Sequence, residues 1–406
     1  MVDSQQHPPG THRASLSRTQ GDRPEGSRME VDLAGGEAPG CDRIVRIQTG
    51  ARLHFGLLAE KNEAGRSFGG CGMMIGQPGC DLELRLTEER SGEASKSGGL
   101  SITVPETLDS RDWCRERIRL VWERCLRPDT GGDVRGGRGG AGFREQGRGA
   151  VEVVVHAAVP PHRGLGAGTQ LALAVASGLA LLQGRSVPAA AVLAAQTGRG
   201  LRSAVGLHGF LQGGFLVDGG KQPGAVAGSL ATRVPFPADW RVVLLAPVHQ
   251  EGLSGEREVR AFEQAVRIPA DVTNELCRTI VMELLPALSE SDFHGFSRAL
   301  YEYGCTVGEC FRPAQGGRYA TRELDALVGL LRKAGVAGTG QTSWGPSVFA
   351  LCATAAEAED LAQAARGGMI PGAGPLPCAC TVEVSTPLNR GATLTGRPAA
   401  DLLPGS

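Results

Sequence analysis

The 406-residue sequence has no excess of charge of either sign and very little lysine. Forty-two basic residues stand against 43 acidic ones, which gives a formal net charge of −1 at pH 7. Such a chain has no overall attraction for nucleic acid or for an anionic membrane, and we expect neither as a partner. An anionic ligand therefore needs a local site. Only four of the basic residues are lysines, a bias to which we attach little functional weight.

Long apolar runs and metal-binding motifs are also missing. The longest apolar run, residues 171–182, is interrupted by Ser177 and Gly178 and is shorter than the roughly 20 residues of a membrane span. The eleven cysteines form no CxxC pair and the eight histidines form no HExxH motif. We therefore expect reduced thiols, no zinc and a cytoplasmic location. The polar N-terminus has no apolar segment typical of a signal peptide.

The length of the chain suggests two domains plus additional sequence, because domains average roughly 150 residues. The 60 glycines indicate many loops. We expect a disordered tail at 1–40, a first domain at 41–218 with a disordered Gly/Arg insertion at 129–148, a linker at 219–237, a second domain at 238–390 and a second tail at 391–406. No period of 20 to 50 residues repeats, which excludes solenoids and propellers.

Hydrophobic periodicity predicts mixed secondary structure in both halves. In the first half we predict strands at 43–48, 52–58, 73–75, 81–86 and 151–158, a turn at 49–51, helices at 107–126, 168–182 and 188–197, and a hairpin at 209–218. In the second half we predict strands at 242–247, 347–352 and 381–384, with helices at 256–266, 272–285, 291–310, 321–334 and 355–365. The chain is therefore expected to be of the α+β class.

The segment 160–170, PPHRGLGAGTQ, carries the clearest functional signal. It joins a predicted strand to a predicted helix, where glycines let backbone N–H groups converge and the helix dipole favours an anion. The segment matches neither the GxxxxGK[ST] loop of ATPases nor a dinucleotide-binding GxGxxG in its usual setting, so we expect no NAD. The predicted phosphate-binding residues are Gly164, Leu165, Gly166, Ala167, Gly168, Thr169 and Gln170.

The PxxxGLGxxxxxxxA pattern of this segment resembles the phosphate loop of the GHMP kinase superfamily. Further blocks resemble one branch, the β-ribofuranosylaminobenzene 5′-phosphate synthase family. They are RLHFGLL (52–58), FGGCGMMI (68–75), GLGAGTQLALAVA (164–176), GRGLRSAVG (198–206), GGFLVDGG (213–220) and GLSGERE (252–258). The resemblance implies a GHMP-like two-domain fold, with a ribosomal-protein-S5-like N-terminal domain, a ferredoxin-like C-terminal domain and the ligand between them.

Two positions depart from the pattern of the kinases. Kinases of the superfamily carry an Asp that acts on the attacking hydroxyl, a short way before a glycine pair. The nearest comparable positions before Gly213 and Gly214 hold Arg202 and Ser203, and an arginine is not a base at neutral pH. Ala167 stands where a serine is usual. We expect phosphate binding to survive and kinase chemistry to be lost.

The resemblance implies a ribosyltransferase of tetrahydromethanopterin biosynthesis. Its substrates would be phosphoribosyl pyrophosphate and 4-aminobenzoate or 4-hydroxybenzoate, and it would release CO₂ and pyrophosphate. Mg²⁺ is expected with the diphosphate. Pyridoxal phosphate is not expected, because no lysine lies in the matched blocks. A GHMP small-molecule kinase and a non-catalytic ligand sensor or scaffold are the alternatives, and a homodimer is left open.

Several residues are candidates for this chemistry, each with a plainer alternative. Arg52, His54 and Arg202 are the predicted catalytic residues and Arg199 a further phosphate ligand, unless the arginines are surface residues and the histidine is structural. Gln341, Ser343 and Trp344, in a second glycine-rich block at 338–346, are the predicted substrate-binding residues, although Trp is also common in cores. Asp218 and Glu256 are the predicted metal ligands, with Glu258 equally eligible; a turn or a helix N-terminus would also explain them.

Overall fold

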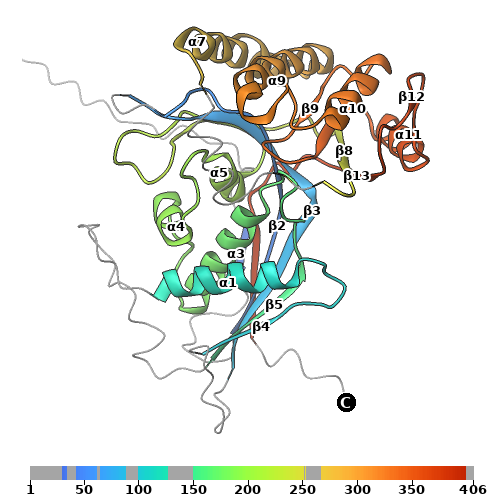
Figure 1. The fold of residues 1–406 in the computed structure, drawn as a ribbon. Coiled ribbons are helices and arrows are strands. Elements are labelled where there is room, and N and C mark those ends of the chain that lie inside the picture. Colours follow the sequence, from blue (N-terminus) through green and yellow to red (C-terminus); the bar gives the residue numbers. More distant parts are fainter. Residues whose placement is uncertain are drawn as a thin grey trace, which may run out of the picture.

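The computed structural model describes residues 30–33, 43–61, 65–87, 99–126, 150–250, 252 and 267–398, which form two domains (Figure 1). The predicted insertion at 129–148, the helix at 256–266 and the candidate metal ligands Glu256 and Glu258 lie outside these residues. Within the described ranges, no helix has both the length and the apolar character to cross a membrane.

The N-terminal domain is built on a large twisted sheet. The strand order is β1-β14-β2-β3-β5-β4, and β6 pairs with both β3 and β7. The strands are β1 (Glu30–Leu33), β2 (Arg43–Gly56), β3 (Gly70–Thr87), β4 (Leu100–Thr103), β5 (Ala150–Ala157), β6 (Phe215–Asp218), β7 (Leu230–Val234) and β14 (Thr393–Pro398). The long strands β2 and β3 run through the middle of the domain in Figure 1.

Helices cover one face of this sheet. They are α1 (Arg111–Leu126), α3 (Ala167–Leu182), α4 (Ala190–Thr197) and α5 (Val205–Gln212). α3 is apolar around most of its circumference because it lies between the sheet and α1. Gly178 allows its close approach to the sheet, since a Cβ there would lie 2.9 Å from side-chain atoms of Ile47 and Leu84. This packing fixes where α3 begins, at the end of the glycine loop.

The C-terminal domain has a four-stranded antiparallel sheet in the order β13-β8-β10-β9. The first strand of the domain lies between the last and the third, which is the ferredoxin-like order that we expected. The strands are β8 (Arg241–Pro247), β9 (Thr339–Gln341), β10 (Val348–Cys352) and β13 (Cys380–Ser385), and the small β11 (Met369–Ile370) pairs with β12 (Gly374–Pro375). The helices are α7 (Ala270–Thr279), the π-helix η1 (Ile280–Leu284), α8 (Leu285–Glu290), α9 (Phe293–Gln315), α10 (Arg322–Lys333) and α11 (Ala355–Arg366).

Alternation along β8 places helices on both faces of the C-terminal sheet. Val243 and Leu245 belong to a core with residues of α10 and α11. Val242 and Leu244 belong instead to the main core, which continues into α9 and the N-terminal domain. Successive side chains of a strand point to opposite faces, so this pattern places α9 at the junction between the domains.

Two local predictions are wrong. Residues 49–51 form no turn between two strands: β2 is continuous, with a bulge at Gly50, where a Cβ would lie 1.9 Å from the carbonyl oxygen of Ile75. Residues 209–218 form no hairpin, because 205–212 are the helix α5 and only 215–218 form a strand. The glycines of α5 break its helical pattern in the sequence, and its helical state is stabilised by burial of side chains such as Phe210.

The predicted domain limits also differ from the structure at three places. Residues 393–398, expected in a tail, form β14, which pairs with β2 and buries Leu394. Residues 30–33 form β1 beside β14. The predicted linker 219–237 contains β7. Each segment adds backbone hydrogen bonds to a sheet, an interaction between distant parts of the chain that local composition does not reveal.

Candidate active site

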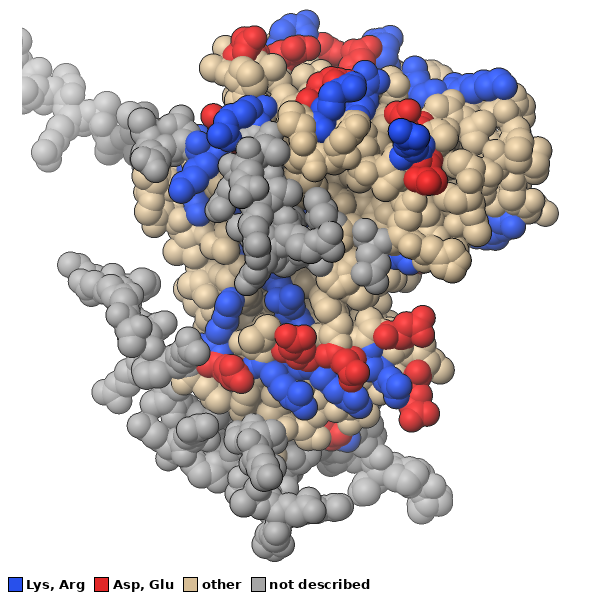
Figure 2. Space-filling model, viewed as in Figure 1, with Lys and Arg blue, Asp and Glu red and all other residues tan. Residues whose placement is uncertain are grey.

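A cavity of about 570 Å³ lies between the two domains. Its lining comes from β2, α1, the glycine loop with the start of α3, the loop 198–203, α9 and the segment 339–345. Gly166 and Gly340 both line it, so the two glycine-rich segments face one cavity, as we expected. In the view of Figure 2, basic side chains lie in the middle of the molecule, between its upper and lower parts.

The two glycine-rich segments are in direct contact. Thr342 Oγ1 donates a hydrogen bond to the carbonyl oxygen of Gly164 (3.1 Å). A Cβ at Gly345 would lie 2.1 Å from the backbone nitrogen of Gly164, so a side chain does not fit there. Gly252 also joins them, because its N–H donates to the carbonyl oxygen of His162 (2.9 Å). Residues of both domains therefore form the lining of the cavity.

One end of the cavity combines a helix N-terminus with arginines. Gly166 has φ 77° and precedes α3. Its carbonyl oxygen accepts from the N–H groups of Thr169 and Gln170, which leaves the N–H groups of Ala167 and Gly168 as the first donors of α3 toward the cavity. A Cβ at Gly166 would lie 3.3 Å from Arg52 Nε, and one at Gly168 would lie 3.0 Å from Arg199 Nη2. Two of the predicted arginines therefore flank the predicted phosphate loop.

Two residues of α1 complete this end and were missed in the sequence. The Trp113 ring lies 3.6 Å from the Cβ position of Gly168, and the Arg117 guanidinium lies 5.7 Å from the centroid of that ring. Burial, and less strongly the charge of Arg124, lower the pKa of Arg117. The only available signal was the i, i+4 spacing of the two residues, which places them on one face of a helix.

The described lining is rich in cations and holds no carboxylate. Arg202 lines the cavity with Arg52, Arg117, Arg199 and Arg318. Neither Asp nor Glu occurs among the described lining residues. Such a surface favours a ligand with more than one negative charge.

His54 is buried and joins β2 to neighbouring loops. Its Nε2 lies 2.9 Å from Ser203 Oγ, and its backbone N–H donates to Thr342 Oγ1 (3.0 Å). Burial, followed by the charge of Arg52, lowers the pKa of His54 well below its usual value. The imidazole is therefore neutral at pH 7, so it orients Ser203 without adding positive charge.

A second part of the lining, the aromatic end, is mostly apolar. The ring of Trp344 meets that of Phe311 edge-on, with centroids 5.0 Å apart, and Phe55 lies in the same lining. α9 turns two small residues toward this end, Gly304 and Gly308. A Cβ at Gly304 would meet no atom within 4 Å, so this side of the helix borders open space. The cavity can therefore accommodate a flat ring at its aromatic end beside a highly charged group at its arginines.

Gln170 and Gln341, two of the predicted ligands, have amides that already bond to the protein. Gln170 lies outside the lining; its Oε1 accepts from Thr49 Oγ1 (2.9 Å) and its Nε2 donates to the carbonyl oxygen of Gly206 (3.0 Å). Gln341 lines the cavity with Ser343, but its Nε2 donates to the carbonyl oxygen of Ser343. These bonds indicate that the two glutamines shape the site.

Asp218 also lies outside the lining. It is buried, and its carboxylate accepts from the backbone N–H groups of Ala204 (2.6 Å) and Gly220 (2.9 Å). Burial raises its pKa, although those two hydrogen bonds oppose the shift. The described residues contain no group of three or more His, Cys, Asp or Glu placed to hold a metal ion. The position of Asp218 thus favours support of the loop before α5.

Comparisons of the sequence with known proteins confirm the resemblance. Residues 284–370 match the family described as GHMP kinases C terminal. The chain is 29% identical over 322 residues to a beta-ribofuranosylphenol 5′-phosphate synthase of Methanothermobacter thermautotrophicus, covering 75% of this chain and 88% of the relative. It is 29% identical over 323 residues to the protein of that name from Archaeoglobus fulgidus, covering 76% and 88%.

Solved structures confirm the fold. Homoserine kinase from Cytophaga hutchinsonii aligns with a TM-score of 0.55 at 18% identity, over 89% of this chain and 99% of the kinase. Mevalonate pyrophosphate decarboxylase from Streptococcus pyogenes aligns with a TM-score of 0.56 at 12% identity, over 86% and 98%. The chain therefore has the GHMP-like two-domain α+β fold.

Proposed function

We propose that this chain, a relative of the beta-ribofuranosylphenol 5′-phosphate synthases, is a ribosyltransferase. It joins phosphoribosyl pyrophosphate to 4-aminobenzoate or 4-hydroxybenzoate with release of CO₂ and pyrophosphate, an early step towards tetrahydromethanopterin. The observation that carries the proposal is the cavity itself, where an arginine-rich end with a helix N-terminus adjoins an aromatic end. The absence of carboxylates from the described lining does not favour a kinase that needs an acidic base.

The donor would bind with its diphosphate at the glycine loop. The N–H groups of Ala167 and Gly168 and the guanidinium groups of Arg52 and Arg199 suit phosphate oxygens, and Arg117 adds charge nearby. These groups would stabilise the negative charge that develops on the leaving pyrophosphate. We propose Mg²⁺ as a partner of the diphosphate oxygens; the described residues supply no metal cluster of their own, and no step here depends on one.

The acceptor would lie with its ring at the aromatic end. The ring carbon that bears the carboxylate attacks C1 of the ribosyl group, forming a carbon–carbon bond while the bond from C1 to the diphosphate oxygen breaks. The electron pair of the bond to the carboxylate then returns to the ring, and CO₂ leaves. A para amino or hydroxyl group feeds electron density to the attacking carbon. The faces of Trp344 and Phe311 suit a flat ring next to a carbon with positive character.

His54 and Arg202 would act at the junction of the two ends. Neutral His54 holds Ser203 and connects β2 to the second glycine-rich segment, so it keeps Arg52 in place on the same strand. Arg202, next to Ser203 in the lining, would contact the ribosyl 5′-phosphate. In this proposal the arginines bind the anionic groups of the substrates, and the imidazole positions its neighbours.

The test is release of CO₂ from a labelled acceptor. Purified protein is incubated with Mg²⁺, phosphoribosyl pyrophosphate and carboxyl-labelled 4-hydroxybenzoate or 4-aminobenzoate, and the released label is counted. We expect release with at least one of them, none without the donor, and little from plain benzoate, which lacks the electron-donating group. The name of the relatives contains the word phenol, which makes 4-hydroxybenzoate the first acceptor to try. No release from either acceptor, together with ATP consumption when a small alcohol is present, would replace this proposal with the kinase.

A further inference from the structure

Arg318 lines the cavity from the C-terminal domain, whereas the other lining arginines of the described residues come from the N-terminal domain. It follows α9 and packs against it: a Cβ at Gly308 would lie 2.7 Å from both Arg318 Cγ and the Arg318 carbonyl oxygen. Gly308 is three residues before Phe311, so both are on the same face of α9. Arg318 is therefore next to the aromatic end of the cavity.

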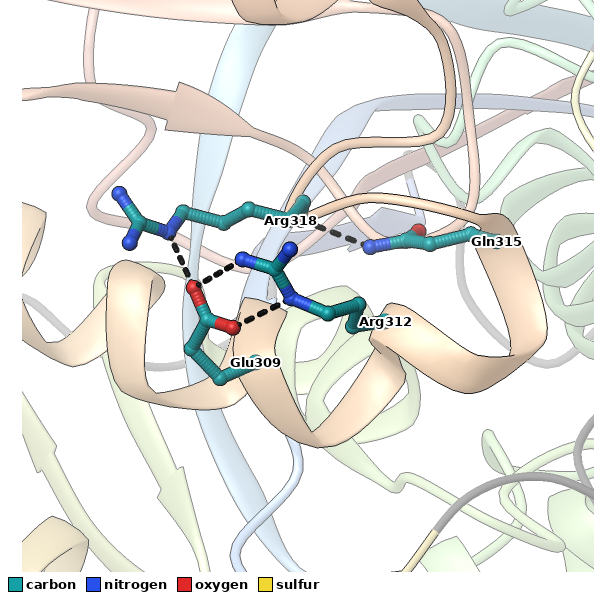
Figure 3. A network of polar contacts seen from close by, with 4 residues as sticks. All are labelled: Glu309, Arg312, Gln315 and Arg318. Carbon is teal, nitrogen blue, oxygen red and sulfur yellow. Dashed lines mark hydrogen bonds and ion pairs between the residues drawn. The ribbon is translucent and has the colours of Figure 1, made fainter.

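A network of polar contacts holds the Arg318 side chain (Figure 3). Glu309 Oε1 accepts from Arg318 Nε (2.8 Å), and the same carboxylate accepts from Nε and Nη2 of Arg312 (2.6 and 2.9 Å). These bonds hold the pKa of Glu309 at about 2, so the carboxylate stays charged at neutral pH. Figure 3 shows that the two terminal nitrogens of Arg318 point away from Glu309. The cluster of two arginines and one glutamate retains a net positive charge.

The backbone around Arg318 is joined to the segment that carries the cavity tryptophan. Gln315 Nε2 donates to the Arg318 carbonyl oxygen (2.7 Å), and Gln341 Oε1 accepts from the N–H of Ala320 (2.8 Å). Gln341 lies three residues before Trp344. The backbone that carries Arg318 and the segment that carries Trp344 are therefore held together by hydrogen bonds, which fixes the position of the guanidinium relative to the aromatic end.

We propose that Arg318 binds the carboxylate of the benzoate acceptor through its terminal nitrogens, with Glu309 as a positioning residue. The inference rests on the proposed function. A benzoate is a carboxylate attached to a flat ring. The C-terminal domain correspondingly lines the cavity with the Arg318 guanidinium beside the aromatic rings of Phe311 and Trp344. Because Glu309 accepts only from Nε, the two terminal nitrogens remain as a pair of donors in one plane. Neutral CO₂ carries no charge for Arg318 to hold, so the contact does not retain this product.

The test compares a charged ligand with its neutral analogue. Titration calorimetry measures binding of 4-hydroxybenzoate and of 4-hydroxybenzamide to the full-length wild type and to Arg318→Gln. We expect the wild type to prefer the carboxylate by roughly 10-fold or more, the low end for a charge-assisted hydrogen bond at a partly exposed group. In Arg318→Gln the preference should fall to about 1, with the affinity for phosphoribosyl pyrophosphate unchanged.

Arg312→Gln is the matched control, because Arg312 contacts the same Glu309 carboxylate but is not part of the cavity lining. It should keep the wild-type preference. Glu309→Gln should raise KM for the acceptor a few-fold at unchanged kcat and unchanged melting temperature. An unchanged preference in Arg318→Gln, or a loss of donor binding instead, overturns the inference.

Failure of the inference and failure of the proposed function give different results. If the wild type binds 4-hydroxybenzoate but releases no CO₂, the proposed function fails while the comparison of Arg318→Gln with wild type still decides the role of Arg318. If the wild type binds neither 4-hydroxybenzoate nor 4-aminobenzoate, both the proposed function and the role of Arg318 are wrong. If CO₂ is released and Arg318→Gln behaves as wild type, only the role of Arg318 is lost.

Discussion

Replacing Gly166 by Asp should strongly weaken anion binding at the glycine loop while leaving the fold largely intact. Gly166 is the residue that caps α3, and its side chain would point at Arg52. An aspartate there places a carboxylate among the donors that we assign to the diphosphate. It would therefore pair with Arg52 and repel the ligand.

The expected cost to folding is small compared with the free energy of unfolding of a typical domain. A non-glycine residue at φ 77° costs roughly 1–2 kcal/mol, and a Cβ 3.2 Å from Arg52 Cβ demands a shift of a few tenths of an ångström. Two like charges about 4 Å apart repel by about 4 kcal/mol at a protein surface, and halving this for solvent screening still leaves roughly a 30-fold loss of affinity.

The assay is calorimetric titration with inorganic pyrophosphate and with phosphoribosyl pyrophosphate, alongside thermal unfolding. Gly166→Asn is the control, since asparagine has nearly the same volume and tolerates positive φ but carries no charge. We expect Asn to lose much less affinity than Asp at a similar melting temperature. Equal losses in both variants would show that space, not charge, matters at this position, and wild-type binding by Gly166→Asp would refute the assignment of the loop.

Three further predictions follow from single residues. The pKa of His54 is lowered in the fold, so its stabilising effect is complete above the unfolded pKa of about 6.5 and is lost as pH falls toward the folded pKa. His54→Gln should therefore flatten the slope of the urea-unfolding free energy against pH below about pH 6.5. Arg199→Lys keeps the charge but loses the planar fork, and we expect about 10-fold weaker pyrophosphate binding by calorimetry, with wild-type affinity counting against a direct contact. Asp218→Asn turns an NH₂ toward a backbone N–H of Ala204 or Gly220 and should cost about 1–3 kcal/mol in urea unfolding; an altered Mg²⁺ requirement at wild-type stability would instead indicate a metal ligand.

The glycine loop could be predicted from the sequence because its parts are contiguous. A strand, a turn with Gly164 and Gly166, and an apolar helix follow one another, and the chemistry of a helix N-terminus depends on that local order. Arg52 and Arg199 were predicted from matched blocks, and the structure brings both to the loop. Their shared position required the whole sheet to form, which the blocks alone do not describe.

Other parts of the site depend on packing that leaves little local signal. Arg117 and Arg318 resemble ordinary surface arginines in the sequence, since nothing next to them shows that they line a cavity. Gln170 and Asp218 present the opposite difficulty, because polar residues in matched blocks suggest ligands, whereas the structure shows protein groups as their hydrogen-bond partners. Deciding between these roles requires knowledge of what each side chain faces.

The pairing of β14 with β2 sets an order of events during synthesis. β2 carries Arg52 and His54, and one of its edges is hydrogen-bonded to residues 393–398. Domains at the N-terminus of a chain usually fold while the rest is still being made. Here the first domain waits for a strand that emerges after the entire second domain, so the cleft is completed last. Until then, the exposed edge of β2 is open to pairing with other chains, and we expect a prematurely terminated chain to aggregate rather than to be partly active.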